Sequence, residues 1–137
     1  MNTVFLDTNI VLDVLLNREK FNSHSAAVWH AYETGKTHGL ISAVSLSNIH
    51  YVYAKIYGKP MAVKAVRLTL AVFITIPLNE KILRLAADNP GNDFEDAIQL
   101  YSALEARASC IVTRNPRDFP QGLIQLFSPG EFLANHT

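Results

Sequence analysis

The sequence predicts a single α/β domain, residues 1–137, in which helices cover both faces of a mostly parallel sheet. The chain has 137 residues, the length of one ordinary domain, and its composition is 49% hydrophobic and 18% charged. This composition excludes disordered and low-complexity chains. Short apolar runs alternate with helix-like patterns, which is typical of right-handed βαβ crossovers. In folds of this class the ligand site lies beyond the carboxyl ends of the strands.

The first half of the chain alternates apolar runs with capped helices. The expected elements are a strand at 4–6, a helix at 10–16, a helix from Ser23 or Ser25 to Thr34-Gly35, a strand at 38–41, a helix from Ser42 or Ser45 to Gly58-Lys59-Pro60, and a helix at 61–71. Apolar residues at helical spacing support the helices, and serine and glycine are common capping residues. The polar run Asp7-Thr8-Asn9 therefore falls at the carboxyl end of the first strand.

The second half continues the same alternation. The expected elements are a strand at 72–76, a helix through 82–86, a turn at 89–92, a helix from Asp93 to Ala108-Ser109, a strand at 110–113 and a short strand at 123–127. Residues 72–76 are β-branched, aromatic or aliphatic and stop at Pro77, as strands commonly do. Asp93 is a natural helix N-cap.

One cysteine and the lack of long apolar runs limit the classes of protein. Cys110 cannot form an internal disulfide, and the sequence after Met1 lacks the pattern of a signal peptide, so we expect a cytoplasmic protein. No apolar run approaches the roughly 18 residues that span a bilayer. We therefore expect no membrane insertion.

Charge is unevenly distributed, although the formal net charge is zero. Between Glu33 and Glu80 there is no acidic residue, and the five cations of that segment are Lys36, Lys55, Lys59, Lys64 and Arg67. Three tyrosines at 51, 53 and 57 interleave with these cations, a pattern that suits a polyanion with bases available for stacking. A solvated helix face with tyrosines in the core explains the same pattern. The charges alone do not decide between these two interpretations.

Polar residues are expected to meet at the carboxyl edge of the sheet. Asp7 follows the first strand, and Thr113-Arg114-Asn115 follows the fourth, with Asp118 in the same loop. These strand ends meet if the two strands are neighbours. An aspartate, a threonine and an asparagine would then share one crevice.

Two further acids lie in the first turn of one helix. Asp93 and Asp96 are an i, i+3 pair and face the same way, where the helix dipole favours negative charge. Carboxylates gathered in a crevice raise one another's pKa unless a cation neutralises them. Oxygen-only donors favour Mg²⁺ or Mn²⁺ over Zn²⁺. This set of residues therefore suits metal-dependent phosphodiester hydrolysis.

Three motifs occur in a specific order and spacing. They are Val4-Phe5-Leu6-Asp7-Thr8-Asn9, Asp93-Phe94-Glu95-Asp96-Ala97 and Val112-Thr113-Arg114-Asn115-Pro116-Arg117-Asp118-Phe119. Together they resemble a PIN domain, the nuclease fold of VapC-type toxins, over essentially the whole chain. The resemblance implies a three-layer α/β/α sandwich with a central parallel sheet. It also implies cleavage of single-stranded RNA at an Mg²⁺ or Mn²⁺ site, a homodimer, and an antitoxin protein as partner.

The expected site residues form two groups. The catalytic group is Asp7, Asp93, Asp96 and Asp118, of which Asp7, Asp96 and Asp118 match the family's first, third and fourth acidic positions and are the expected metal ligands. The supporting or substrate-binding group is Thr8, Asn9, Asn48, Thr113, Arg114 and Asn115. Arg114 is expected beside the acidic crevice, where it could hold phosphate or pair with Asp118.

One family position departs from the pattern. The helix after the second strand usually carries a glutamate in a stretch like L-x-E-I, and the matching stretch here is Leu46-Ser47-Asn48-Ile49. An asparagine carbonyl can still ligate a hard ion, but one negative charge is lost. Asp93 could restore that charge from the neighbouring helix.

Two functions from different classes therefore stay open. The first is a metal-dependent endoribonuclease, the toxin of a toxin-antitoxin pair. The second is a catalytically weakened PIN-like domain that binds RNA or a protein partner. A phospho-acceptor receiver domain is disfavoured, because Thr113 is followed by Arg114 and Asn115 where a receiver would carry a lysine after a late strand.

Overall fold

A computed structural model describes residues 3–18, 22–33 and 38–136 of the chain. Its elements are β1 (Thr3–Leu6), α1 (Thr8–Leu15), α2 (Asn22–Glu33), β2 (His38–Ser42), α3 (Ala43–Tyr57), α4 (Lys59–Val72), β3 (Ile74–Ile76), α5 (Glu80–Asp88), α6 (Phe94–Glu105), β4 (Cys110–Val112), the 3-10 helix η1 (Pro116–Asp118), β5 (Gln125–Phe127) and α7 (Pro129–His136). Within this described part, none of the helices has the length and apolar character needed to cross a membrane.

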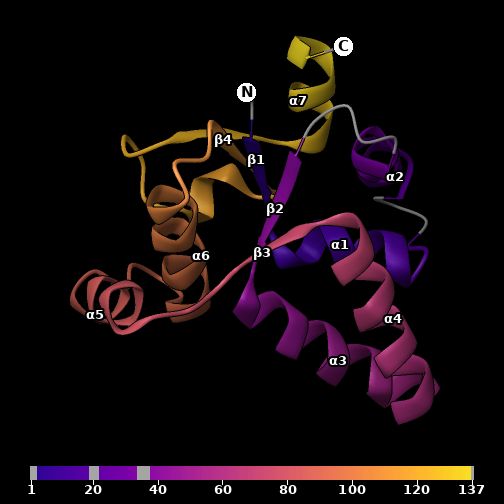
Figure 1. The fold of residues 1–137 in the computed structure, drawn as a ribbon. Coiled ribbons are helices and arrows are strands. Elements are labelled where there is room, and N and C mark those ends of the chain that lie inside the picture. The colour runs from indigo at the N-terminus through magenta and orange to yellow at the C-terminus, as the bar shows by residue number, and fades with distance from the viewer. Residues whose placement is uncertain (1–2, 19–21, 34–37, 137) are drawn as a thin grey trace.

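The strands of the described residues form one parallel sheet in the order β3-β2-β1-β4-β5. Helices pack on both faces of this sheet (Figure 1), which confirms the predicted α/β/α sandwich. The chain builds β2 and β3 on one side of β1 and then returns to add β4 on the other side. A topological switch point therefore falls between β1 and β4.

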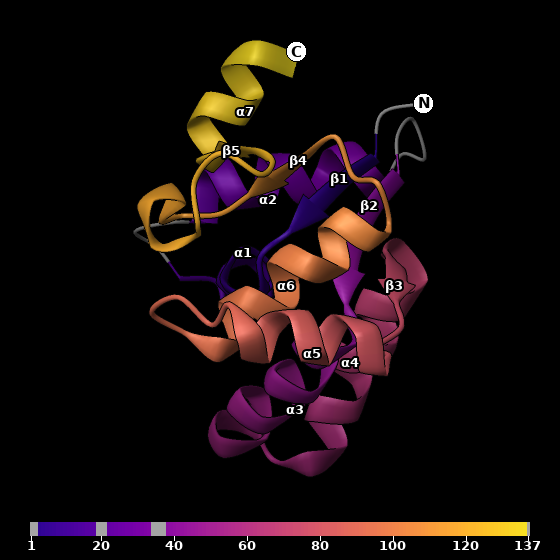
Figure 2. The ribbon, with the colours of Figure 1, turned by 90° about the vertical axis from the view of Figure 1, so that its left-hand side faces the viewer.

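Successive residues of β1 enter the cores of opposite faces. Val4 and Leu6 pack in a cluster with side chains of α1, α2 and α7, whereas Phe5 packs with Leu100 of α6 and Ile111 of β4. A further apolar cluster joins α5 to α6. Figure 2 shows α5 and α6 in front of the sheet, with α3 and α4 side by side below it. The alternation of a strand with a period of two thus fixes which helices cover which face.

The helical hairpin α3-α4 turns at Gly58. Gly58 has a φ of +90°, in the region that favours glycine, and its N–H donates to the Ala54 carbonyl at 2.9 Å. The Ser42 side chain accepts from the Val44 N–H and caps the start of α3. The two predicted helices and a break at Gly58 are present, but α4 begins at Lys59 rather than at Met61.

Several element ends differ from the sequence prediction. α1 begins at Thr8, and α4 continues through Val72, so that Phe73 ends it and β3 is confined to residues 74–76. The sequence prediction ends with the strand at 123–127 and lacks α7. Instead Ser128 and Glu131 form a capping box, with backbone N–H to side-chain distances of 2.8 and 3.1 Å, and start that helix. Thr34-Gly35, predicted to end α2, lies outside the described residues.

Gly39 of β2 leaves room for an aromatic cluster. A Cβ atom at position 39 would lie 2.7 Å from Cδ1 of Phe73 and 3.0 Å from Cγ of Tyr32. Phe73 is buried and also meets Trp29 edge-on, with ring centroids 4.9 Å apart. The cluster cannot move away without opening this part of the core.

We therefore expect Gly39→Ala to lower the free energy of unfolding by about 1–3 kcal/mol, the cost of overpacking a filled core. Urea denaturation monitored by circular dichroism measures the change. Gly130→Ala is the matched control, because its nearest heavy atoms are those of the His24 ring at 3.4 Å. Equal unfolding midpoints for the two variants would contradict the steric argument.

Candidate active site

The candidate site lies where β1 and β4 end side by side. Leu6 pairs with Val112 in parallel register, so the next residues, Asp7 and Thr113, meet at the same edge of the sheet. The Asp7 N–H donates to the Val112 carbonyl at 3.0 Å and extends the pairing by one residue. The two strands are thus neighbours, which is the condition under which their ends were expected to meet. The site therefore sits at the switch point of the sheet.

Asp7 is a buried carboxylate with two side-chain donors. Only 5% of the residue is exposed. Thr113 Oγ1 donates to Oδ2 at 2.7 Å, and Gln99 Nε2 donates to Oδ1 at 3.1 Å. Burial raises the pKa of Asp7 above its usual range, while the hydrogen bonds from Thr113 and Gln99 oppose that rise. Burial of this carboxylate is therefore energetically unfavourable in itself, and the two hydrogen bonds fix the positions of both of its oxygens.

Gln99 is a site residue that the sequence prediction missed. It is fully buried on α6, and its Oε1 accepts the Thr8 N–H at 3.1 Å while its Nε2 donates to Asp7. One carboxamide therefore links the start of α1 to the side chain of Asp7. Its position three residues after Asp96, on the same helix face, is the signal that could have identified it.

Thr8 connects two further elements to the site. Its hydroxyl lies 2.7 Å from Ser45 Oγ on α3 and donates to Glu95 Oε1 on α6 at 3.2 Å. Because the Thr8 proton goes to Glu95, Ser45 donates in the first of these bonds. The side chain of Asn48 also acts on Glu95 and lowers its pKa, against the effect of burial. Glu95, which was not among the predicted site residues, thus lies directly beside Asn48.

These residues line a cleft of about 430 Å³. Among the residues that the structure describes, those that line the cleft are Asp7, Thr8, Asn9, Leu12, Asn48, Val52, Asp93, Glu95, Asp96 and Asp118. The cleft therefore collects five carboxylates, from the residue after β1, the residue before α6, α6 itself and η1. No lysine, arginine or histidine occurs among these lining residues.

The electrostatics of the cleft disfavour its full ionisation. Burial, followed by the charges of Asp7, Asp93, Glu95 and Asp118, raises the pKa of Asp96 to about 7. Burial likewise raises the pKa of Glu95, against the hydrogen bonds from Thr8 and Asn48. A bound cation would relieve this repulsion.

The donor set fits a hard divalent cation in its chemistry. The polar atoms in the cleft are carboxylate, hydroxyl and carboxamide groups, and the oxygens among them are the ligands that Mg²⁺ and Mn²⁺ prefer. Among the described residues, no three acidic, histidine or cysteine side chains are gathered into a ready-made metal site. The residues that could hold a metal are therefore present in one cleft without being assembled around one point.

Most of the predicted site residues come together. Thr113 donates a hydrogen bond to Asp7. The cleft is lined by Asp7, Thr8, Asn9, Asn48, Asp93, Asp96 and Asp118. Asp93 is exposed at the cleft and accepts the Asp96 N–H at 3.0 Å, so it also serves as the N-cap of α6. Asn115 is exposed, and its N–H donates to Thr113 Oγ1 at 3.2 Å.

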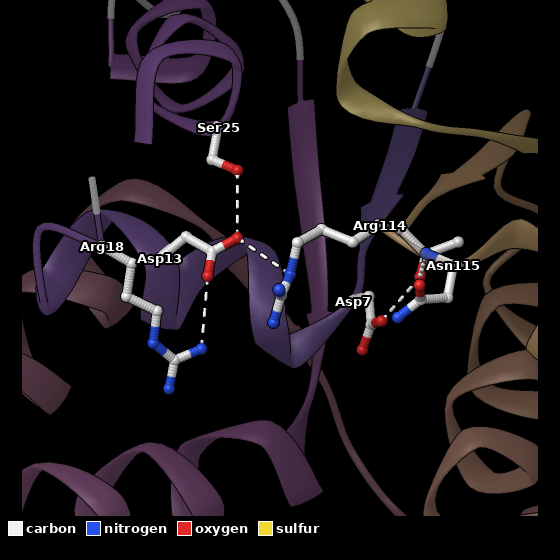
Figure 3. A network of polar contacts seen from close by, with 7 residues as sticks. Asp7, Asp13, Arg18, Ser25, Arg114 and Asn115 are labelled. Carbon is white, nitrogen blue, oxygen red and sulfur yellow. Dashed lines mark hydrogen bonds and ion pairs between the residues drawn. The ribbon is translucent and has the colours of Figure 1, made fainter. Parts of the chain in front are cut away.

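Arg114 lies apart from this set. Its Nε is 3.1 Å from Oδ2 of Asp13, a fully buried residue of α1, rather than at the acidic cleft. Arg18 donates to the other Asp13 oxygen at 3.2 Å, and Ser25 of α2 donates to Oδ2 at 3.3 Å. Figure 3 shows the Arg114 side chain extending away from Asp7 toward Asp13. The structure thus places Arg114 in a buried ionic network that joins α1, α2 and the loop after β4.

The fold and the acidic cleft at its switch point define a PIN-type α/β domain. The family model described as PIN domain matches residues 3–117, and the chain belongs to that family. No curated protein matches the chain.

Solved structures share the fold at low sequence identity. DNA-bound VapBC from Salmonella typhimurium matches with a TM-score of 0.71 and 18% identity, covering 94% of this chain and 99% of that one. A toxin-antitoxin complex from Klebsiella pneumoniae has a TM-score of 0.69 and 22% identity, with 92% and 97% coverage. VapC20 of Mycobacterium tuberculosis, a sarcin-ricin loop cleaving toxin, has a TM-score of 0.66 and 13% identity, with 79% and 86% coverage.

We expect Arg114→Met to lower the free energy of unfolding by about 2 kcal/mol, because it leaves the buried Asp13 carboxylate with fewer charged partners. Arg84→Met is the matched control, since Arg84 pairs with Glu80 at 3.2 Å on the surface, where both side chains are more than 70% exposed. That variant should lose less than about 1 kcal/mol. Urea denaturation compares the two. A loss no larger than that of the control would contradict the structural role of Arg114.

Proposed function

We propose that this PIN domain is a metal-dependent endoribonuclease, the toxin of a toxin-antitoxin pair. The observation that carries the proposal is the cleft at the switch point, where five carboxylates line one space and Asp7 is held by Thr113 and Gln99. Burial and repulsion raise the pKa of Asp96 to about 7. A fold gains no stability from such a set of acids, so a role in binding a cation accounts for it better than a structural role.

The proposed ions are Mg²⁺ and Mn²⁺, and the residues that would hold them are Asp7, Asp96 and Asp118. When bound, such an ion would supply positive charge at a phosphodiester and make a water molecule more acidic. The contribution of the chain itself is orientation. Thr113 and Gln99 hold both oxygens of Asp7, and Thr8 holds Glu95 beside Asn48.

Partners follow from the relatives. The Salmonella and Klebsiella structures are a VapBC and a toxin-antitoxin complex, and the Mycobacterium relative is a cleaving toxin. We carry over from them a cleavage reaction and an antitoxin protein as partner, with RNA as the substrate and the cytoplasm as the location. We also propose a homodimer, because Val63 and Leu70 of α4 and Leu83 and Leu85 of α5 are exposed apolar side chains.

Asn48 supports one alternative, a PIN domain that binds RNA or a protein without turnover. The presence of Glu95 in the same cleft as Asn48 favours the enzyme over this alternative. Asn48 occupies the position where the family usually has a glutamate. Glu95 places a carboxylate near it in the cleft. We propose that Glu95, rather than Asp93, supplies the missing charge, since Asp93 is already engaged as the N-cap of α6.

We expect the purified protein to cleave single-stranded RNA in Mg²⁺ or Mn²⁺ and to lose this activity in EDTA. Asp7→Asn should lower the rate by at least about 100-fold, and Thr113→Val by roughly 10- to 100-fold, because Thr113 acts through Asp7. Gel analysis of an end-labelled RNA measures both. Glu105→Gln, at the other end of α6, is the control and should retain full activity. Cleavage that survives both EDTA and Asp7→Asn would contradict the proposal.

Exchange of the charge between positions 48 and 95 tests the role of Glu95. Glu95→Gln retains acceptors for Thr8 and Asn48 but removes one charge, so Mn²⁺ affinity should fall by about 10-fold or more. Asp93→Asn keeps a good N-cap and should have a smaller effect. The double variant Asn48→Glu with Glu95→Gln moves the carboxylate from position 95 to position 48 within the same cleft and should recover affinity.

The increase in melting temperature with added Mn²⁺ reports this affinity without any need for turnover. Saturation at about 100 times the dissociation constant adds roughly 2.7 kcal/mol of stability. A larger loss for Asp93→Asn than for Glu95→Gln would assign the charge to Asp93 instead. No thermal shift in the unaltered protein would contradict the metal site as a whole.

A further inference from the structure

The helix α3 extends from the cleft to the protein surface. Asn48 and Val52 line the cleft, and Ser45 lies beneath it in contact with Thr8. Residues three and four apart on a helix share a face, so Asn48, Tyr51 and Lys55 form one stripe along α3. At a rise of about 1.5 Å per residue, Tyr51 lies one turn and Lys55 two turns from Asn48. The stripe thus begins in the cleft and leaves it.

Tyr51 and Lys55 are an exposed aromatic and cationic pair on this stripe. Tyr51 is 60% exposed, and the Lys55 Nζ lies 4.6 Å from the centre of its ring. Folding of the chain thus leaves the large aromatic side chain of Tyr51 at the surface, beside a polar cleft. A cation near the ring places a phosphate-binding group next to a surface on which a base can stack.

The charge around the pair points to a polyanion. The cleft itself is lined by five acids and would repel a phosphate backbone. The hairpin α3-α4, in contrast, has no acidic residue, and its cations are Lys55, Lys59, Lys64 and Arg67, all exposed. A nucleic acid strand that enters the acidic cleft therefore needs contacts on the adjacent basic hairpin.

We propose that Tyr51 and Lys55 bind the nucleotide next to the cleaved phosphate of a single-stranded RNA, with its base on the Tyr51 ring and its phosphate on Lys55. The inference rests on the proposed function, which brings RNA to the cleft. It adds a binding position outside the acidic set. Only an unpaired base can lie on an exposed ring, so this position favours single strands over duplexes.

Binding of a fluorescein-labelled single-stranded RNA to the cleavage-deficient Asp7→Asn protein in Mg²⁺ tests the proposal separately from turnover. In this background Tyr51→Ala should weaken binding by about 5- to 100-fold, the range for loss of one stacked base. Tyr51→Phe keeps the ring and should bind within about 3-fold of the parent. Lys55→Ala should reduce the slope of binding against salt by about 0.7.

Tyr57→Ala is the matched control. Tyr57 is a 53% exposed tyrosine of the same helix, but it packs against Tyr53 and lies off the stripe. Its removal should leave RNA affinity unchanged, and Tyr51→Ala should leave the weaker affinity for an RNA duplex unchanged.

Unchanged single-strand affinity in Tyr51→Ala would overturn the proposal. If that variant instead shifts the molar mass in light scattering, the stripe is a contact between protein chains, which also overturns it. In the otherwise unaltered enzyme, Tyr51→Ala should raise KM and leave kcat nearly unchanged. A protein that binds RNA through Tyr51 but never cleaves it would contradict the proposed nuclease while supporting the binding position.

Discussion

The candidate site depends on the burial of one carboxylate. Asp7 follows β1 directly, and its oxygens are fixed by Thr113, which follows β4, and by Gln99 of α6. Gln99 and Thr113 lie 92 and 106 positions from Asp7 in the chain, so the geometry of Asp7 exists only when both strands and α6 are in place. Gln99 also accepts the Thr8 N–H, which ties the start of α1 to the same point. Folding and assembly of the site are therefore the same event.

This dependence explains what the sequence could and could not predict. Asp7 and Thr113 were predictable, because parallel strands bring their carboxyl ends to one edge and the motifs mark those ends. Asp93 was predictable as an N-cap. Gln99 shares a helix face with Asp96, but its bonds to Thr8 and Asp7, and that of Glu95 to Thr8, arise from the packing of α6 against α1, which helical spacing alone does not reveal. Burial of a glutamine within an apolar helix face is the kind of choice that only tertiary contacts explain.

Arg114 shows the converse limit of sequence-based prediction, because it was expected at the site and lies elsewhere. The motif suggested a cation beside the acids, and a single sequence has no means to reveal that Asp13 lies within reach. Asp13 is fully buried in α1, where an unpaired charge would be energetically unfavourable. It therefore requires the positive charges of Arg18 and Arg114, which pair with it. The polar residues of the loop after β4 are thus divided between two buried acids. Thr113 contacts Asp7, and Arg114 contacts Asp13.

That division affects how a substrate can bind. Thr113 donates to Asp7, whereas Arg114, at a bend after β4, reaches Asp13. Because the Arg114 guanidinium pairs with Asp13, the charged side chains among the described residues that line the cleft are all acidic. Positive charge for a phosphate backbone must therefore come from a bound ion or from another element. The hairpin α3-α4 provides the second source, because α3 both lines the cleft and carries exposed lysine in a segment without acids. The charge asymmetry along the sequence thus becomes a separation in space between an acidic cleft and the basic surface beside it.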